Sequence, residues 1–352
     1  MTELVPTTAR FPLRSGLTII VPAYNEVSTI ADTVRSLQNQ TVQPEGIIVV
    51  DDCSSDGTGE VAQELGAIVI RPPTNTGSKA GAQTFALPRV STEFTAGIDA
   101  DTILAPHALE LLLAAMEDKE VAAACAFVVP RRVKSVWERG RYVEYLSSYT
   151  MSKQIQDYYG FPLISSGCLS TYRTESLRRA GGWSTRTVGE DMDLTWSFHA
   201  AGLKVRFVPE AVCYPIEPHS LYLMRKQLKR WSHAFIQNLR LHWRAVARVP
   251  YLRLAVAVGL WDATLAPLVY LLMLPLFAIF LSPYWLIGWV IDAPVLLVPV
   301  LFGALPRREL GRALLSYPAV FVLRILNSIE FAKALWLELV MRRSLKDFEK
   351  GH

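Results

Sequence analysis

The sequence predicts an α/β domain with a mostly parallel sheet, followed by amphipathic helices and then membrane-spanning helices. Two observations predict the first part: short β-branched runs alternate with helical patterns, and two of the runs end in acidic clusters. A third observation predicts the membrane-spanning helices: the apolar residues of this 352-residue chain concentrate after about residue 250. The hydrophobic fraction of 51% is high for a soluble protein.

Composition also limits the classes of molecule that the protein is expected to bind. A net charge of +4, without any block of like charges, gives no support to nucleic-acid binding and fits a membrane partner better. The four cysteines show no zinc or disulfide spacing, which indicates a reducing compartment. The first 16 residues contain no apolar core of the signal-peptide type, so we expect the first domain on the cytosolic side.

Four strands are predicted in the first domain. They span residues 17–22, 46–50, 67–70 and 95–98, and a helical pattern over 27–37 follows the first of them. Ligands of parallel α/β sheets bind beyond the carboxyl ends of the strands. The residues that directly follow these strands are therefore the first candidates for a site.

Two acidic clusters occupy such strand ends. Asp99 and Asp101, one residue apart, can hold a hard divalent cation between the protein and a nucleotide diphosphate, although a solvated turn has the same pattern. Asp51 and Asp52 suit a base imide or a ribose hydroxyl, with a helix cap as the alternative. The sequence thus predicts a metal and nucleotide site at this edge.

Two further motifs begin helices. Lys79 lies in the small-residue loop 75–81, which suits the approach of backbone and ammonium to phosphate. Glu190 and Asp191 start a helix over 192–201 that stops at Gly202. Asp191 is either a helix cap or a carboxylate that deprotonates a sugar hydroxyl.

One helical face near the end of the domain combines an amide, a guanidinium and an indole. Gln227, Arg230 and Trp231 follow i, i+3, i+4 spacing and share one side of a helix. Arginine offers a planar fork to a diphosphate, and tryptophan offers an apolar face to a sugar ring. The surrounding stretch, 221–249, is basic and amphipathic, which is typical of a helix docked on anionic headgroups.

The C-terminal third predicts membrane segments. Residues 254–281 and 284–305 are apolar enough to span and would form a hairpin around Ser282 and Pro283. The basic loop 306–312 is then cytosolic. A third segment, 314–340, either spans with its polar side packed inward or lies in the interface, as the basic tail with Arg342, Arg343 and Lys346 favours.

These motifs occur in one order along the chain: PAYNE, DD, GSKAG, DAD, SSGCLSTYR, GED, QLKRW and then membrane helices. This order resembles the membrane-integrated glycosyltransferase family 2 enzymes, the group of hyaluronan, chitin, cellulose and bacterial poly-N-acetylglucosamine synthases. The resemblance covers about residues 17–238, and 189–196 with 207–231 look like the poly-N-acetylglucosamine and chitin branch. It implies a GT-A fold, a UDP-sugar donor, and Mg²⁺ or Mn²⁺.

The resemblance also implies a role for each motif residue. Asp191 is the general base, with Glu190 beside it in the catalytic motif. The nucleotide-sugar side comprises Tyr24, Glu26, Asp51, Asp52, Lys79, Asp99, Gln227 and Arg230. Asp99 and Asp101 serve the metal. The acceptor side comprises Ser166, Gly167 and Cys168, expected on a strand, and Trp231, which stacks on the acceptor sugar.

The expected organisation is a cytosolic domain over 1–218, interfacial helices over 219–250, a membrane domain over 251–340 and a basic tail over 341–352. The expected function is inverting transfer from a UDP-sugar to a saccharide or lipid-linked acceptor, making a β-linked oligo- or polysaccharide at the plasma membrane. With two or three membrane helices after the domain and none before it, a self-contained secretion channel is not expected, and a pore would require homo-oligomers. The alternatives are a polyprenyl-phosphate or protein glycosyltransferase and a non-catalytic nucleotide-sugar sensor.

Overall fold

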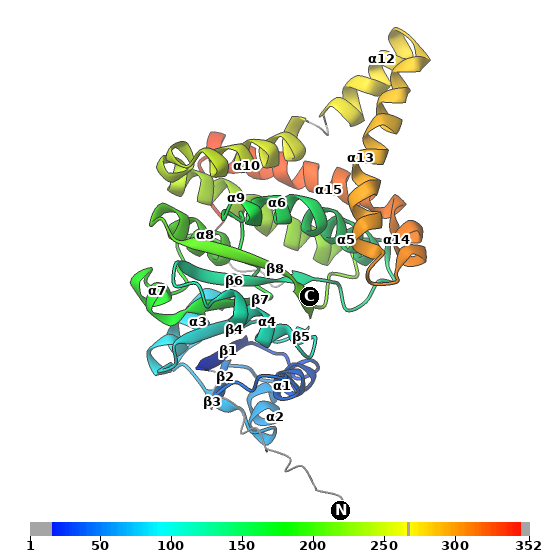
Figure 1. Cartoon of the computed structure of the whole chain (residues 1–352). Coiled ribbons are helices and arrows are strands. Elements are labelled where there is room, and N and C mark those ends of the chain that lie inside the picture. Colours follow the sequence, from blue (N-terminus) through cyan, green and yellow to red (C-terminus); the bar gives the residue numbers. More distant parts are fainter. Residues whose placement is uncertain (1–15, 266–267, 346–352) are drawn as a thin grey trace, which may run out of the picture.

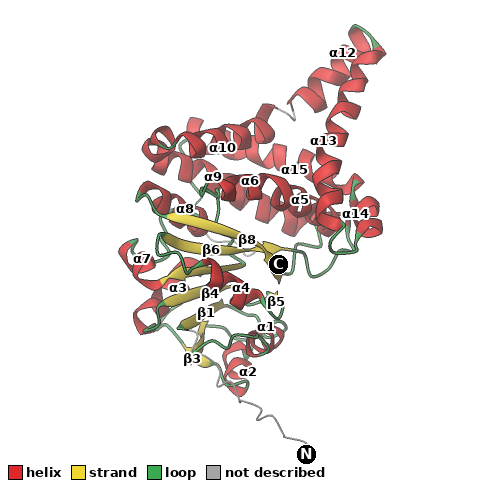
Figure 2. Cartoon of the chain, viewed as in Figure 1, coloured by secondary structure: helices red, strands yellow, loops and turns green. Residues whose placement is uncertain are grey.

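The computed structural model of this chain describes residues 16–265 and 268–345, apart from the side chains of residues 262 and 289–292. Figures 1 and 2 show a sheet flanked by helices, with a layer of long helices above it and a helical hairpin that projects from that layer. Two predictions lie on residues outside the described ones. The first 15 residues were used to predict a cytosolic start, and Lys346 belongs to the predicted basic tail.

One mixed sheet of eight strands organises the described part of the domain, in the order β3-β2-β1-β4-β7-β6-β8-β5. The strands are β1 Leu17–Ala23, β2 Gly46–Asp51, β3 Ile68–Ile70, β4 Phe94–Ile98, β5 Ile103–Leu104, β6 Val121–Val128, β7 Leu169–Arg173 and β8 Lys204–Tyr214. Strands β3, β2, β1 and β4 pair in parallel, as do β6 and β8, whereas β7 is antiparallel to β4 and β6 and β5 is antiparallel to β8. The four predicted strands agree to within one residue at each end. They pair in parallel as predicted, but the sheet as a whole is mixed because β7 and β5 run antiparallel to their neighbours.

Alternation along β1 explains how helices cover both faces of the sheet. Leu17, Ile19 and Val21 pack into the core that contains α1 and α4, while Ile20 packs on the opposite face with α3 and α8. The helices of the domain are α1 Ile30–Gln38, α2 Thr58–Glu64, α3 Lys79–Ala86, α4 Ala108–Ala115, α5 Val136–Ser147, α6 Lys153–Tyr158, α7 Thr174–Arg179 and α8 Glu190–Ala200.

A long helix, α9 Leu221–Arg248, joins the domain to the C-terminal helices. Ser220 caps it by accepting a hydrogen bond from the Leu223 N–H at 3.4 Å, and the helix kinks at His242, whose backbone is not helical. It packs against α8, α10 and α15. The predicted amphipathic stretch 221–249 is therefore one kinked helix.

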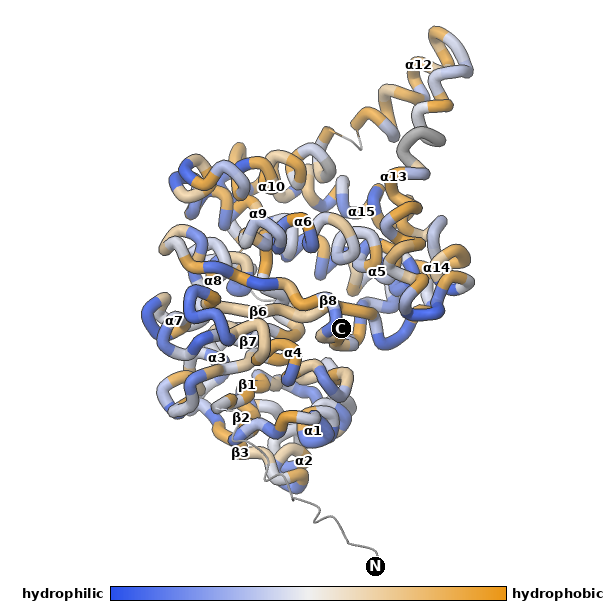
Figure 3. Tube along the Cα trace, viewed as in Figure 1, coloured by the Kyte–Doolittle hydropathy of each residue, from blue (hydrophilic) through white to orange (hydrophobic). Residues whose placement is uncertain are grey.

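The C-terminal region contains α10 Pro250–Leu260, α12 Leu274–Phe280, α13 Ile287–Ala304, α14 Leu310–Ser316 and α15 Pro318–Leu335. Within the described residues one helical segment, Pro250–Phe280, is long and apolar enough to cross a membrane, and Ala293–Ala304 is apolar but shorter. Apolar positions are frequent along α10, which lies in the helical layer, and along α12 and α13, which project from it (Figure 3). The second span, predicted over 284–305, thus stays a prediction.

The segment 314–340 lies against the protein body. Helix α15 packs along α9 and α5, and its Glu330 carboxylate accepts a hydrogen bond from Arg225 of α9 at 2.8 Å. Glu330 is buried and also pairs with Lys333 at 3.2 Å. The polar side of this segment faces protein, which both of its predicted placements allow.

Candidate active site

The carboxyl ends of neighbouring strands meet at one cavity. Because β2, β1 and β4 are adjacent and parallel, the residues that follow them, among them Tyr24, Asp52 and Asp99, come to the same edge of the sheet. A cavity of about 1270 Å³ opens there. Of the predicted site residues, its lining includes Tyr24, Glu26, Asp52, Lys79, Asp99, Asp101, Ser166, Gly167, Cys168, Glu190, Asp191, Gln227, Arg230 and Trp231.

Asp51, the remaining predicted residue, has a different position from its neighbour. The Asp52 carboxylate lines the cavity and accepts hydrogen bonds from the Thr76 N–H and hydroxyl, both at 2.8 Å. Asp51 is not among the described residues that line it. Its carboxylate accepts from the Ser54 N–H at 2.9 Å and pairs with Arg71 at 3.1 Å. In this structure Asp51 therefore holds the β2 turn, and contact with a nucleoside stays a prediction.

Tyr24 and Glu26 follow β1 and differ in exposure. The Tyr24 side chain is 48% exposed, whereas Glu26 is buried and its Oε2 accepts a hydrogen bond from the Thr29 hydroxyl at 2.9 Å. Tyr24 therefore presents part of its side chain to solvent, while the Glu26 carboxylate is held by Thr29. Both line the same cavity as Asp52, and their contact with a nucleoside stays a prediction.

Lys79, at the first turn of α3, is bonded to the opposite side of the cavity. Its ammonium lies 2.5 Å from Asp99 Oδ1 and 3.9 Å from Glu190 Oε1, and it donates to the Gly167 carbonyl at 2.9 Å. Burial opposes the charge, but Asp99 and Glu190 outweigh it and hold the pKa of Lys79 above its ordinary value. Lys79 thus keeps a positive charge at the centre of the cavity.

The motif of Glu190 and Asp191 opens α8 at the cavity wall. Asp191 Oδ1 accepts from the Met192 N–H at 2.8 Å, and its Oδ2 accepts from the Gly167 N–H at 3.1 Å. Glu190 is buried, and burial together with the charge of Asp191 raises its pKa above the ordinary value. The two adjacent carboxyl groups thus differ in environment: Asp191 is partly exposed to the cavity and fixed by two amides.

The metal candidates both line the cavity. Asp101 is buried and its Oδ1 accepts from the Thr102 hydroxyl at 3.2 Å, while Asp99 is engaged by Lys79. In the part of the chain that the structure describes, no three His, Cys, Asp or Glu residues form a group able to hold a metal by themselves. Two carboxylates fit a cation that takes its other ligands from a diphosphate.

Ser166, Gly167 and Cys168 correct one expectation, because they form the loop before β7 instead of a strand. A Cβ atom at Gly167 would lie 3.0 Å from both Asp191 Oδ2 and Lys79 Nζ. The absence of a side chain therefore lets the acid and the ammonium approach the same peptide from two sides. Burial raises the pKa of the Cys168 thiol well above its ordinary value, so the thiol stays protonated.

Helix α9 brings Gln227, Arg230 and Trp231 to the cavity on one face, as their spacing predicts. The positive charge of Arg230 acts on Glu190 and lowers its pKa, against the larger effect of burial. The Trp231 ring is 38% exposed, so one of its sides remains accessible.

Sequence reasoning missed a buried polar cluster beneath this face, centred on Arg141 of α5. The Arg141 guanidinium is fully buried, donates to Gln227 Oε1 at 2.7 Å and lies 4.4 Å from the Trp231 ring centroid. Its Nε lies 3.6 Å from Glu217 Oε2, and it also pairs with Glu144. Local pattern gives no sign of this cluster, since 86 positions separate Arg141 from Gln227.

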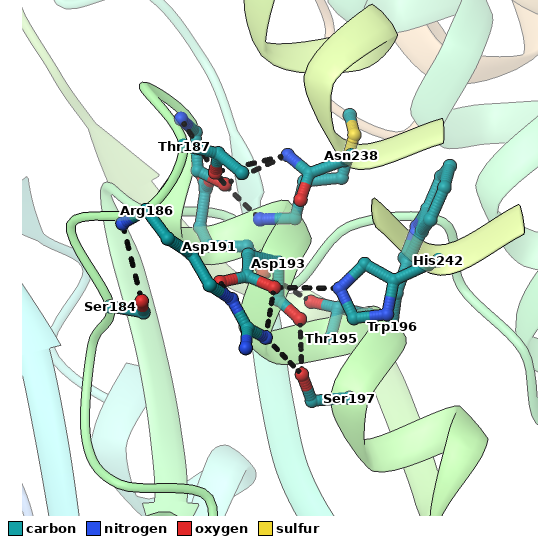
Figure 4. A network of polar contacts seen from close by, with 12 residues as sticks. Ser184, Arg186, Thr187, Asp191, Asp193, Thr195, Trp196, Ser197, Asn238 and His242 are labelled. Carbon is teal, nitrogen blue, oxygen red and sulfur yellow. Dashed lines mark hydrogen bonds and ion pairs between the residues drawn. The ribbon is translucent and has the colours of Figure 1, made fainter. Parts of the chain in front are cut away.

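A second missed cluster ties α8 to α9 (Figure 4). The buried Asp193 carboxylate accepts from Arg186 Nε at 2.8 Å and Nη2 at 2.7 Å, and its Oδ1 lies 2.6 Å from His242 Nε2. Burial opposes its charge, but the hydrogen bonds from His242 and Arg186 hold the pKa of Asp193 below its ordinary value. The kink of α9 at His242 is thereby fixed to the helix that begins with Glu190 and Asp191.

Comparison with known proteins agrees with this geometry. The poly-beta-1,6-N-acetyl-D-glucosamine synthases of Staphylococcus aureus and Staphylococcus epidermidis are 27% and 25% identical to the chain over 222 residues, which is 62% of this chain and 54% of each relative. The chain thus spans about half the length of these relatives. The mannosyltransferase PcManGT from Pyrobaculum calidifontis, solved with GDP-Man and Mn²⁺, has a TM-score of 0.61 at 20% identity over 92% of this chain and 88% of that chain.

The structural likeness shows a GT-A-like α/β fold with a mixed sheet and additional C-terminal helices. The family described as Glycosyl transferase family 2 matches residues 18–181, which run from β1 past β7 and include the acidic strand ends Asp52, Asp99 and Asp101. Residues 18–181 thus match glycosyl transferase family 2, and the remaining helices of the chain lie outside that match.

Proposed function

We propose that this protein is an inverting glycosyltransferase that moves a sugar from a UDP-sugar to a saccharide hydroxyl at the cytosolic face of a membrane. The observation that carries the proposal is one cavity that joins the acidic ends of β2 and β4 to Asp191 and to Arg230. Anionic and cationic groups on its walls suit a nucleotide diphosphate and its counter-charges. The names of the staphylococcal relatives favour UDP-N-acetylglucosamine as donor, with UDP-glucose and GDP-mannose as alternatives.

Asp191 is our candidate for the general base. As the acceptor oxygen attacks the anomeric carbon, its proton passes to the Asp191 carboxylate and the bond from that carbon to the diphosphate oxygen breaks. Attack from the face opposite the departing diphosphate inverts the anomeric carbon. The Met192 and Gly167 amides hold the carboxylate in one orientation, so little reorganisation is needed when the proton moves.

The cationic residues suit the departing nucleotide. Arg230 of α9 offers a planar fork to diphosphate oxygens, and Lys79 provides another cation close to Asp99. Asp99 and Asp101 fit Mg²⁺ or Mn²⁺, which when bound would neutralise charge on the diphosphate. Such an ion would share Asp99 with Lys79, so we expect Lys79 to turn toward phosphate when donor and ion are bound.

The membrane placement is part of the proposal. One helical segment of membrane length follows α9, and α9 carries basic residues beside exposed aromatic ones such as Trp243. We infer that α9 lies at the headgroup level and brings the cavity to the membrane surface. A multi-pass plasma-membrane protein with a cytosolic catalytic domain accommodates these features, and homo-oligomers are compatible with them.

Purified full-length protein, incubated with UDP-sugars and GDP-mannose in Mg²⁺ or Mn²⁺, tests the proposal through release of the nucleotide diphosphate. Asp191→Asn should keep donor affinity and lose transfer, because a base acts on the transition state more than on donor binding. Asp118→Asn, at an exposed acid paired with Lys204, is the matched control. Loss of donor affinity with full turnover at saturation would make Asp191 a helix cap.

The same assay separates the alternatives. A polyprenyl-phosphate transferase would release nucleotide only when polyprenyl phosphate is added, and it would not need Asp191 because a phosphate acceptor is already an anion. A non-catalytic sensor would bind the nucleotide sugar without turnover. All the carboxylates that the resemblance implies are present in the chain, which disfavours a sensor.

A further inference from the structure

The cavity of the candidate active site extends well beyond the space that a nucleotide sugar requires. At one end it is lined by Asp52, Asp99 and Asp191. At the other end the same cavity passes Trp231 and continues among α10, α13 and α15. The catalytic carboxylates and the membrane-side helices therefore line one continuous space.

The residues that the C-terminal helices contribute to this end are mostly apolar, whereas Ser148 and Ser152, from the segment that packs against α13, add hydroxyl groups to the lining. Beyond α9 in the chain, the described lining comprises Ala255, Val258, Gly259, Trp261, Ala263, Tyr270, Val295, Leu296, Val320, Leu323, Arg324, Asn327 and Phe331. Arg324 and Asn327 are neighbours on one face of α15, and the Arg324 guanidinium lies 5.2 Å from the Tyr270 ring centroid. The remaining members, the Tyr270 hydroxyl apart, offer hydrocarbon or aromatic surface.

This composition discriminates between occupants. A saccharide chain carries a hydroxyl on nearly every carbon, and hydroxyl groups that lose water without gaining partners cost free energy. A hydrocarbon chain loses no hydrogen bonds and gains from each methylene that it buries. Two of the helical elements around this end are the one described segment of membrane length, Pro250–Phe280, and apolar α13, and the third is α15, which packs along α9 and α5.

The junction between the two ends suits a sugar. Trp231 is 38% exposed beside the cavity, with its other side toward the Arg141 guanidinium. Asp191, which accepts hydrogen bonds from two backbone amides, is the carboxylate that can take a hydroxyl proton at this point. A headgroup sugar at Trp231 would have its hydroxyl near the base and its aglycone directed toward α10 and α15.

We propose that the acceptor is a glycolipid, whose sugar headgroup lies between Trp231 and Asp191 and whose hydrocarbon chain occupies the cavity among α10, α13 and α15. This inference rests on the proposed function and specifies its acceptor. The headgroup hydroxyl oxygen forms the new bond to the anomeric carbon of the donor sugar, the bond to the nucleotide diphosphate breaks, and the hydroxyl proton passes to Asp191. The products are a lipid with one more sugar and a free nucleoside diphosphate.

The test uses synthetic acceptors that differ in one property. Full-length protein in lipid nanodiscs receives the active donor and alkyl glycosides with the same sugar and chains of increasing length, from methyl upward, below their micelle concentrations. Transfer is measured as kcat/KM, and hydrolysis of the donor by water is measured in parallel. A free oligosaccharide of the same sugar and a polyprenyl phosphate complete the panel.

Matched variants separate the cavity from the bilayer. Val258 and Leu254 are on α10 with the same exposure of 57%, but only Val258 is among the residues that line the cavity. Val258→Trp fills part of the space, whereas Leu254→Trp places the same side chain beside it. Alkyl glycosides partition into the lipid equally for all three proteins, so any difference between the variants reports the cavity.

We expect kcat/KM to rise with chain length by up to about 4-fold per methylene, the limit for full burial. Val258→Trp should reduce the gain from the longest chains at least 10-fold, with methyl glycoside transfer and donor hydrolysis unchanged and Leu254→Trp like the wild type. Four results would each overturn the proposal of a glycolipid acceptor. Two concern the acceptor chain: equal use of short and long alkyl chains, or a preference for the free oligosaccharide over alkyl glycosides. The others are exclusive use of polyprenyl phosphate and equal effects of the two variants. Absence of both transfer and hydrolysis with every donor would instead refute the glycosyltransferase itself, and the glycolipid acceptor with it.

Discussion

Replacing Arg141 with methionine should disable the face of α9 that carries Gln227 and Trp231. The Arg141 guanidinium donates to Gln227 Oε1 at 2.7 Å, lies 4.4 Å from the Trp231 ring centroid and balances the charge of buried Glu217. Methionine fills a similar volume and provides neither the charge nor the hydrogen bond. Arg141 is a positioning residue, because it acts on the cavity through these neighbours.

The expected magnitude has two parts. Removing one member of a buried ion pair leaves Glu217 uncompensated, which costs about 3–5 kcal/mol of folding stability. The hydrogen bond from a charged donor to Gln227 is worth about 1.5–3 kcal/mol. If that second part appears in the transfer step, the rate falls about 10- to 150-fold.

The double variant Arg141→Met with Glu217→Gln separates these parts. It removes the uncompensated charge, and glutamine can still accept the hydrogen bond that the Tyr145 hydroxyl donates at 2.8 Å. Stability should therefore recover much of its loss, whereas transfer should stay low. The assay pairs urea unfolding with the ratio of sugar transfer to donor hydrolysis. Arg141→Lys, which keeps the charge without the planar fork, should fall between wild type and methionine.

Two results would refute this reasoning. A double variant whose transfer-to-hydrolysis ratio equals that of the wild type would mean that Gln227 and Trp231 need no support from α5. Equal losses of transfer and hydrolysis in a stable double variant would place the role of Arg141 on the donor side.

Three further predictions address the same cavity. Asp101→Asn should lower turnover by orders of magnitude without shifting the unfolding midpoint, and activity that persists undiminished in excess chelator would exclude the metal role. Because burial and Asp191 raise the pKa of Glu190, this acid adds stability below its unfolded pKa that is lost as pH rises through its folded pKa. Glu190→Gln should thus raise the urea midpoint at about pH 7.5 and leave it unchanged near pH 4, and an equal gain at both values would contradict the shift. A Cβ atom at Gly189 would lie 2.6 Å from that of Ala234 on α9, so Gly189→Ala should cost about 1–3 kcal/mol and reduce transfer. Gly311→Ala, where the Cβ atom meets open space, is its control, and equal unfolding midpoints for the two variants would contradict the close packing.

Local sequence pattern determined the strands that end at the cavity and the helix that borders it. The β-branched runs that became β1, β2 and β4 are followed directly by acidic residues, so the sheet edge and Asp52, Asp99 and Asp101 could be read together. Helical periodicity alone placed Gln227 and Trp231 on one face. Each of these inferences depends on residues a few positions apart, whose relative geometry the backbone conformation sets.

Tertiary packing decided what those residues contact. Asp51 and Asp52 are neighbours of the same residue type, and Arg71, which follows β3, engages the Asp51 carboxylate while Asp52 stays at the cavity. Lys79 was expected at phosphate but is paired with Asp99. Gly167 has no side chain, so the loop that contains it leaves room for the Lys79 ammonium. Arg141 and Gln227 come from elements far apart in the chain, and so do the residues that line the apolar extension of the cavity. Local periodicity does not encode which side chains meet when such distant elements pack.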